Sequence, residues 1–171
     1  VSAKYNAIKT QGNLNNEIGL PQTLFSMDES TQAAVVEMGM NHFGEISRLT
    51  DATRPTVGII TNVGVSHIEN LGSREGILKA KLEICEGMPD NAPLILNGDN
   101  DLLSTVKDER LNVVFFGIEN GDFRAENIIE SDMNTSFDVK YYGRVQHISI
   151  PTVGIHNVYN ALAVFAALDL T

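Results

Sequence analysis

The chain has 171 residues, of which 43% are hydrophobic and 20% are charged, a composition typical of a globular domain with a buried core. Its 22 acidic residues outnumber its 12 basic residues and give a formal net charge of -10, which argues against sequence-independent binding to nucleic acid or anionic lipid. The single cysteine, Cys85, cannot form an internal disulfide and favours a cytoplasmic compartment, and no apolar stretch approaches the roughly 20 residues of a membrane span.

The first thirty residues are irregular, and Thr10 to Pro21 is predicted to be a loop because its glycines and asparagines tolerate positive φ. From Ala33 onward, apolar runs alternate with helical patterns. The expected strands are 33–38, 57–63, 93–96 and 113–116, and the expected helices are 44–53, 73–88 and 101–107. Near-continuous apolarity suits strands covered on both faces, so this alternation predicts an α/β fold with a doubly wound, mostly parallel sheet.

After Gly117 the alternation ends. Three consecutive β patterns, at 123–129, 135–142 and 144–150, are separated by turn signals. We interpret them as a small antiparallel β appendage to the main sheet. The segment 157–170 is rich in alanine and leucine, lacks glycine and proline, and is predicted to be a helix.

Two candidate metal ligands follow predicted strands, where ligands of open α/β sheets bind. Glu37 lies at the end of an apolar strand, two residues before a glycine, so its carboxylate is placed to reach magnesium directly or through water. An ordinary solvated glutamate explains this position equally well. His67 follows the strand 57–63, and its imidazole could ligate a metal or contact a phosphate. A lone loop histidine is, however, more often a surface or packing residue.

The helical pattern 73–88 separates two lysines. One face is entirely charged and comprises Glu75, Lys79, Glu83 and Glu86. The complementary stripe is apolar apart from one residue and comprises Ile77, Lys81, Ile84, Cys85 and Met88. Burying an isolated ammonium is costly and lowers its pKa, so Lys81 must be neutralised, paired or chemically altered. A neutral lysine can add carbon dioxide to form a metal-binding carbamate, and the alternatives are a buried acidic partner or a side chain that extends past the helix edge.

Several well-known phosphate- and metal-binding motifs are absent from the sequence. No Gly-x-x-x-x-Gly-Lys-Ser/Thr phosphate loop and no His-Glu-x-x-His pattern occurs. The other three histidines, His42, His147 and His156, have no cysteine or histidine partner at zinc spacing. The sheet therefore carries features of a phosphate-binding edge without a phosphate cradle.

A set of motifs spans the chain from about Thr10 to Leu168. In order they are Thr10 to Pro21 (TQGNLNNEIGLP), Glu37 to Ile46 (EMGMNHFGEI), Ile60 to Gly64, Ser66-His67, Gly72-Ser73, Lys79 to Lys81 and Gly154 to Ala163. Together they resemble the Mur ligase family, and within it most closely the members that join D-alanyl-D-alanine to a UDP-N-acetylmuramoyl tripeptide in peptidoglycan synthesis. The resemblance implies a P-loop-NTPase-like central domain that binds ATP and magnesium.

The resemblance also implies roles for individual residues. Glu37 and His67 would bind the magnesium ions that accompany ATP, and Lys81 would be a carbamylated lysine that helps to hold one of them, so that Lys81 and His67 serve catalysis. The implied substrate-binding residues are Asn13, Asn15, Asn16, Asn41 and His42. Those at the adenine side of the nucleotide are His156, Asn157 and Asn160.

Members of this family use the γ-phosphate of ATP to activate a carboxylate as an acyl phosphate, which an incoming amine attacks to give an amide. The family's phosphate loop would lie just upstream of Val1, and its UDP-binding and carboxyl-terminal domains would flank the chain. We therefore expect the chain alone to be inactive, and the full-length enzyme to be a monomer.

Two alternatives stay open from the sequence. One is the central domain of another Mur ligase or of a folylpolyglutamate synthase. The other is a non-catalytic binding module of the same fold, for which the missing phosphate loop is the supporting feature.

Overall fold

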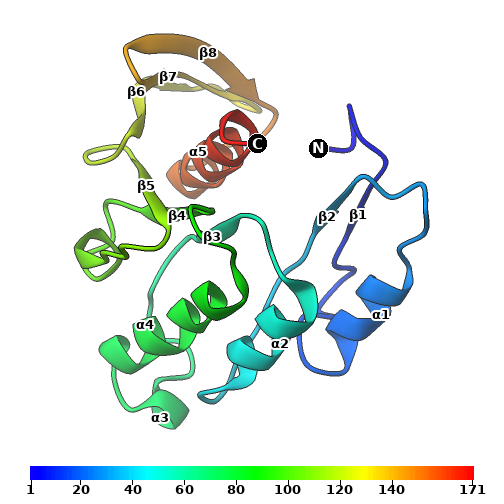
Figure 1. The fold of residues 1–171 in the computed structure, drawn as a ribbon. Helices are drawn as coiled ribbons and strands as arrows, with labels where there is room; N and C mark the ends of the chain where they lie inside the picture. The colour runs from blue at the N-terminus through cyan, green and yellow to red at the C-terminus, as the bar shows by residue number, and fades with distance from the viewer. The chain divides into compact units, whose positions relative to one another are not determined.

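The computed structural model describes all 171 residues, which divide into two compact units. The first unit comprises residues 1–55 and 65–88, and the second comprises residues 56–64 and 89–171. Figure 1 shows their elements, and each unit has its own β-sheet. None of the helices is both long and apolar enough to pass through a lipid bilayer.

The first unit combines a two-stranded parallel sheet with short helices. Strand β1 (Ala7–Lys9) pairs with β2 (Ala33–Val35). The helices are α1 (Gly19–Phe25), α2 (Glu45–Thr53), α3 (Ile68–Leu71) and α4 (Arg74–Leu82), and α4 runs directly into the 3-10 helix η1 (Glu83–Gly87). Helix α2 contacts both α4 and η1, and the buried residues of this layer include Ile46, Leu49, Ile77 and Ala80.

Local sequence explains how α4 begins and how η1 packs. The Ser73 hydroxyl accepts a hydrogen bond from Gly76 N at 3.2 Å, which satisfies a free amide at the start of α4. At the other end, a Cβ added to Gly87 would lie 2.3 Å from the Thr50 main-chain oxygen. Only glycine therefore allows η1 to approach α2 this closely, and the Thr50 hydroxyl donates to Ile84 O at 2.9 Å across the contact.

The second unit is a six-stranded sheet in the order β3-β4-β5-β6-β7-β8. Its strands are β3 (Gly58–Ile60), β4 (Pro93–Asn97), β5 (Asn112–Gly117), β6 (Phe123–Glu130), β7 (Thr135–Tyr141) and β8 (Arg144–Ile150). Strands β3 to β6 are parallel, whereas β6, β7 and β8 are antiparallel. The 3-10 helix η2 (Leu103–Thr105) follows β4, and helix α5 (Ile155–Asp169) follows β8.

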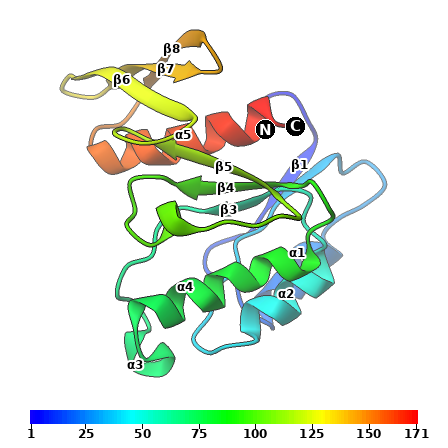
Figure 2. The same cartoon turned by 60° about the vertical axis from the view of Figure 1, so that its left-hand side comes forward.

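Helix α5 lies along the sheet and contacts β4, β5 and β6 (Figure 2). The shared core is apolar and includes Ile95, Val114, Phe116, Phe123, Phe137, Val139, Val158 and Leu162. Two further aromatic rings extend it, because Tyr141 stacks on Phe123 at 5.4 Å and meets Phe165 edge-on at 5.0 Å between ring centroids. Burial of these side chains holds α5 to the strands.

The predicted fold class is confirmed, as are the helices near 44–53 and 157–170 and the three antiparallel strands. The antiparallel strands are attached to the main sheet, as predicted, through β6, which pairs in parallel with β5. The predicted strand 33–38 is shorter and belongs to the two-stranded sheet with β1, which the sequence did not indicate. The predicted helix 101–107 is reduced to the three residues of η2, where serine, threonine and valine compete poorly for helix.

Candidate functional site

Lys81 and Glu37 lie close enough for their charges to interact. Lys81 is in the last turn of α4 and is half-buried, whereas Lys79 is exposed, as the helical spacing predicted. Burial lowers the pKa of Lys81 below its usual value, and the nearby carboxylate of Glu37 only partly opposes that shift. The neutral amine, which is the form that reacts with carbon dioxide, is therefore more accessible at Lys81 than in an exposed lysine.

The asparagine-rich loop fixes Glu37. Asn15 donates from Nδ2 to Glu37 Oε1 at 2.9 Å, and the Thr10 hydroxyl accepts from Glu37 N at 2.8 Å. Gly39 N donates to Asn15 O at 2.7 Å, and a Cβ on Gly39 would lie 2.9 Å from the Asn15 amide. The predicted loop and the predicted metal ligand are thus in direct contact, and Asn15 orients the carboxylate.

The other asparagines of the loop differ from Asn15. Asn16 accepts at Oδ1 from Ile18 N at 3.1 Å and from Gly19 N at 2.9 Å, so it supports the start of α1. Asn13 is exposed, and its side chain makes no hydrogen bond within the protein. Of the three, only Asn13 has a side-chain amide with no hydrogen bond to the protein at either end.

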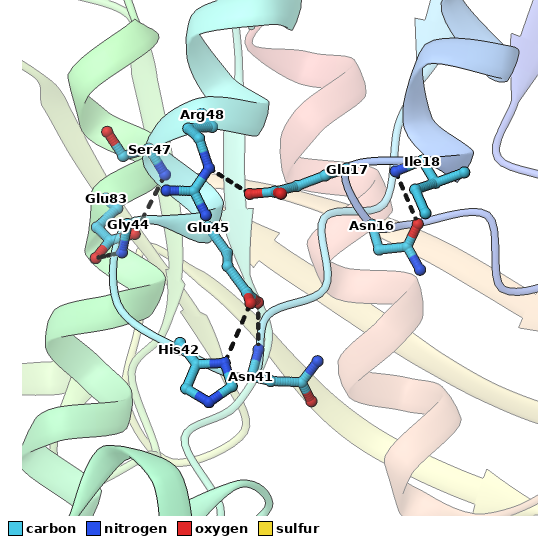
Figure 3. A network of polar contacts seen from close by, with 10 residues as sticks. All are labelled: Asn16, Glu17, Ile18, Asn41, His42, Gly44, Glu45, Ser47, Arg48 and Glu83. Carbon is cyan, nitrogen blue, oxygen red and sulfur yellow. Dashed lines mark hydrogen bonds and ion pairs between the residues drawn. The ribbon is translucent and has the colours of Figure 1, made fainter.

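The stretch Asn41-His42 is held by the first turn of α2 (Figure 3). Glu45 Oε2 accepts from Asn41 N at 2.6 Å, and Glu45 Oε1 lies 3.3 Å from His42 Nδ1. The amide of Asn41 is the main cause of the lowered pKa of Glu45. Both Asn41 and His42 are exposed, so Glu45 holds the backbone of Asn41 and one ring nitrogen of His42, while the Asn41 side chain and His42 Nε2 remain open to a ligand.

The helical spacing placed Glu83 and Glu86 on an outward, charged face; Glu86 is exposed and Glu83 is half-buried, and both also bind the start of α2. Glu83 Oε1 accepts from Gly44 N at 2.8 Å and Oε2 from Ser47 N at 3.2 Å, while Glu86 Oε2 accepts from the Ser47 hydroxyl at 2.5 Å. The reason is the change from α-helix to 3-10 helix after Leu82. A 3-10 helix has 3.0 residues per turn instead of 3.6, which changes the direction of the side chains after Leu82 and lets both glutamates reach α2.

His67 lies at the start of α3 and is exposed. Its φ of 66° is uncommon for a residue other than glycine, and its carbonyl accepts from Asn70 N and Leu71 N, both at 3.1 Å. No three histidine, cysteine, aspartate or glutamate side chains form a group that could hold a metal ion. The structure thus brings Glu37 and Lys81 together, and it shows no hydrogen bond from the His67 side chain to either.

The carboxylate of Glu37, together with a carbamate on Lys81, would suit magnesium even without such a group of three side chains. This ion keeps several waters and is commonly held by one or two carboxylates together with substrate phosphates. Glu37 supplies one carboxylate, and a carbamate on Lys81 would supply a second anionic oxygen group. The pair therefore fits the ion that the sequence indicated.

The three residues expected at the adenine side share the first two turns of α5. Asn157 donates from Nδ2 to Val153 O at 2.8 Å and to the Thr152 hydroxyl at 3.1 Å. His156 and Asn160 are exposed. Gly154 has a φ of 102°, and a Cβ there would lie 2.7 Å from the His156 ring, so this glycine makes room for the imidazole.

Sequence reasoning missed Asp99, the most heavily hydrogen-bonded carboxylate of the second unit. Its partners are Ile118 N, Glu119 N, Asn120 N, Asn120 Nδ2 and the Tyr159 hydroxyl. The signal was present, because Asp99 follows the apolar run of β4 by two residues, where polar residues of such sheets serve ligands or their supports.

The family described as Mur ligase middle domain matches residues 1–168. The chain belongs to the Mur ligase family. The UDP-N-acetylmuramoyl-tripeptide--D-alanyl-D-alanine ligase of Bacillus subtilis is 42% identical over 167 residues, which are 98% of this chain and 36% of that protein.

Two solved Mur ligases share the fold. The MurF structure from Acinetobacter baumannii matches with a TM-score of 0.92 and 31% identity over 99% of this chain and 38% of that one. The MurF ligase of Thermotoga maritima, solved in complex with ADP, matches with a TM-score of 0.87 and 27% identity over 99% of this chain and 41% of that one. The chain therefore spans little more than a third of the length of these relatives, and the family predicted from its motifs is confirmed.

Proposed function

We propose that the chain is the central ATP- and magnesium-binding domain of a cytoplasmic ligase that adds D-alanyl-D-alanine to a UDP-N-acetylmuramoyl tripeptide in peptidoglycan synthesis. The observation that carries the proposal is the half-buried Lys81 beside Glu37, with the asparagine loop hydrogen-bonded to that glutamate. The Bacillus subtilis relative, whose name states this activity, supports the choice of substrates.

Magnesium bound with ATP would reduce the repulsion between the substrate carboxylate and the γ-phosphate and would neutralise the charge that develops during transfer. Glu37, oriented by Asn15, would hold the ion. The neutral amine of Lys81 would attack carbon dioxide, form a nitrogen–carbon bond and release one proton to water, which leaves a carbamate anion as a further ligand. His67 would join them as a metal ligand.

The exposed polar side chains would fall into two groups, one for the muramoyl peptide and the γ-phosphate and one for the adenine side of ATP. Asn13, Asn41 and His42 are open to solvent in the first unit and would face the muramoyl peptide and the γ-phosphate. Asn15 and Asn16 would serve the same region as supports of the loop. In the second unit, His156, Asn157 and Asn160 would contact the adenine side of ATP.

The test uses the full-length enzyme that contains this domain. Phosphate release from ATP is measured with the UDP-muramoyl tripeptide in the presence of D-alanyl-D-alanine, of single amino acids, or of a folate with glutamate. We expect release with the dipeptide only. Release with a single amino acid or with folate would assign the domain to another ligase, and no release with any of them would favour a binding module.

The isolated chain provides a second measurement. Since it contains no Gly-x-x-x-x-Gly-Lys-Ser/Thr loop, we propose that it binds ATP weakly and releases no phosphate. ATP-dependent phosphate release by the purified chain would contradict this part of the proposal.

A further inference from the structure

Four residues at the end of β4, Asn97 to Asn100, link the carboxyl ends of neighbouring strands. On one side, Asn97 Nδ2 donates to Thr61 O at 3.1 Å, and Asn100 Nδ2 donates to Asn62 Oδ1 at 2.9 Å. These bonds tie the segment after β3 to the carboxyl end of β4 and the residues that follow it. The opposite side is held by the carboxylate of Asp99.

Asp99 binds the loop that follows β5. Its Oδ2 accepts from Ile118 N at 2.6 Å and from Glu119 N at 3.1 Å, and its Oδ1 accepts from Asn120 N at 2.7 Å. The approach depends on Gly117, because a Cβ there would lie 2.1 Å from Asn120 O and 2.8 Å from Asp99 Oδ2. The loop and the carboxylate therefore fit each other without room for a side chain between them.

The same carboxylate also reaches α5. The hydroxyl of Tyr159 donates to Asp99 Oδ2 at 2.9 Å across sixty residues of sequence. Burial and the bond to Asp99 raise the pKa of Tyr159 to about 12, so the hydroxyl remains a donor at neutral pH. An ionised carboxylate offers about four acceptor positions, and the protein donors already fill them. Asp99 is thus a support and has no place left for a ligand of its own.

Tyr159 lies within the part of α5 that carries the adenine-side residues, three positions after His156 and one before Asn160. A hydrogen bond at this point fixes the rotation of the helix about its axis, which apolar packing alone restrains less strictly because it is not directional. The direction in which His156, Asn157 and Asn160 point depends on that rotation.

We propose that Asp99 and Tyr159 are positioning residues for nucleotide binding, and that their hydrogen bond sets the first two turns of α5 and with them His156, Asn157 and Asn160. This inference rests on the proposed function. It concerns residues that do not touch the nucleotide and act only through the helix.

The experiment compares Tyr159→Phe, Asp99→Asn and Tyr141→Phe in the full-length enzyme. We expect Tyr159→Phe to raise the KM for ATP about tenfold, which corresponds to about 1.4 kcal/mol, with kcat and the KM for D-alanyl-D-alanine within twofold of wild type. Asp99→Asn should raise the KM for ATP at least as much. Tyr141→Phe is the matched control, since Tyr141 also packs against α5 but its hydroxyl makes no hydrogen bond within the protein, and its kinetics should equal those of wild type.

The outcomes separate the two proposals. If wild-type enzyme performs the ligation and Tyr159→Phe keeps the wild-type KM for ATP, the positioning role is wrong while the proposed function stands. The positioning role is equally wrong if Tyr159→Phe lowers only the melting temperature, or if it raises the KM values of all substrates by the same factor. If wild-type enzyme shows no ATP-dependent ligation, the proposed function is wrong and the positioning role fails with it.

Discussion

Replacing Glu83 with alanine should loosen the start of α2. The N-cap residue of that helix is Gly44, with a φ of 82° and no side chain to cap the free amides. Glu83 does this instead, with bonds of 2.8 Å to Gly44 N and 3.2 Å to Ser47 N. A hydrogen bond to a charged group contributes about 1.5–3 kcal/mol, but the second bond is long and water would partly replace both.

We therefore expect Glu83→Ala to cost about 2 kcal/mol in the free energy of unfolding, equivalent to a fall in melting temperature of about 4–8 °C for a chain of this length. Glu83→Gln, which keeps one acceptor, should lose roughly half as much. The control is Glu29→Ala, which removes the same charge from an exposed residue without a hydrogen-bonded side chain.

The assay combines urea unfolding with amide hydrogen exchange. Unfolding reports the global cost, and exchange at Gly44 and Ser47 reports the local one, which is useful because two compact units need not unfold together. If Glu83→Ala unfolds within about 0.5 kcal/mol of the Glu29→Ala control and both amides keep their protection, Glu83 does not cap α2 and the reasoning fails.

Three further predictions concern activity, pH dependence and packing. In the full-length enzyme, Lys81→Ala should lower ATP-dependent phosphate release by about 100-fold or more, because it removes the proposed metal ligand, whereas Lys79→Ala should stay within about threefold; equal losses would refute the distinction. Hydrogen bonds, first that from Asn127, lower the pKa of Asp138, so its contribution to stability is present above its usual value of 3.8 and lost as pH falls. Acid unfolding of Asp138→Asn should lack that component, and an unchanged acid transition would contradict the assignment. Gly87→Ala should destabilise the chain by about 1–3 kcal/mol in thermal unfolding, because its new Cβ would clash with the backbone of α2. A melting temperature equal to that of wild type would show that the structure accommodates the added Cβ.

The sequence predicted features that depend on periodicity. The alternation of apolar runs and helical patterns indicated the parallel sheet, and helical spacing separated Lys81 from Lys79, because both signals repeat over several turns or strands. Motif resemblance indicated the family. The contact between the asparagine loop and Glu37 follows from the order of segments only once the strands are paired.

Features that depend on tertiary contacts were missed. Strand β1 has only three residues, and its pairing with β2 joins segments more than twenty residues apart. Helix α1 contains Pro21 in its first turn, where the missing amide is tolerated, yet the surrounding glycines and asparagines indicated a loop. The positions of Glu83 and Asp99 depend on a 3-10 turn and on two tight glycine contacts, which no local pattern indicates.

Strand β6 joins the parallel part of the sheet to the antiparallel part, which has a practical consequence for engineering. It pairs in parallel with β5 and antiparallel with β7, and β7 contributes Phe137 and Val139 to the core beneath α5. Trimming the β7–β8 hairpin would therefore strip apolar cover from α5 itself. Tags and labels belong at the exposed hairpin tips, near Met133 or Gly143, where the chain reverses without entering the core.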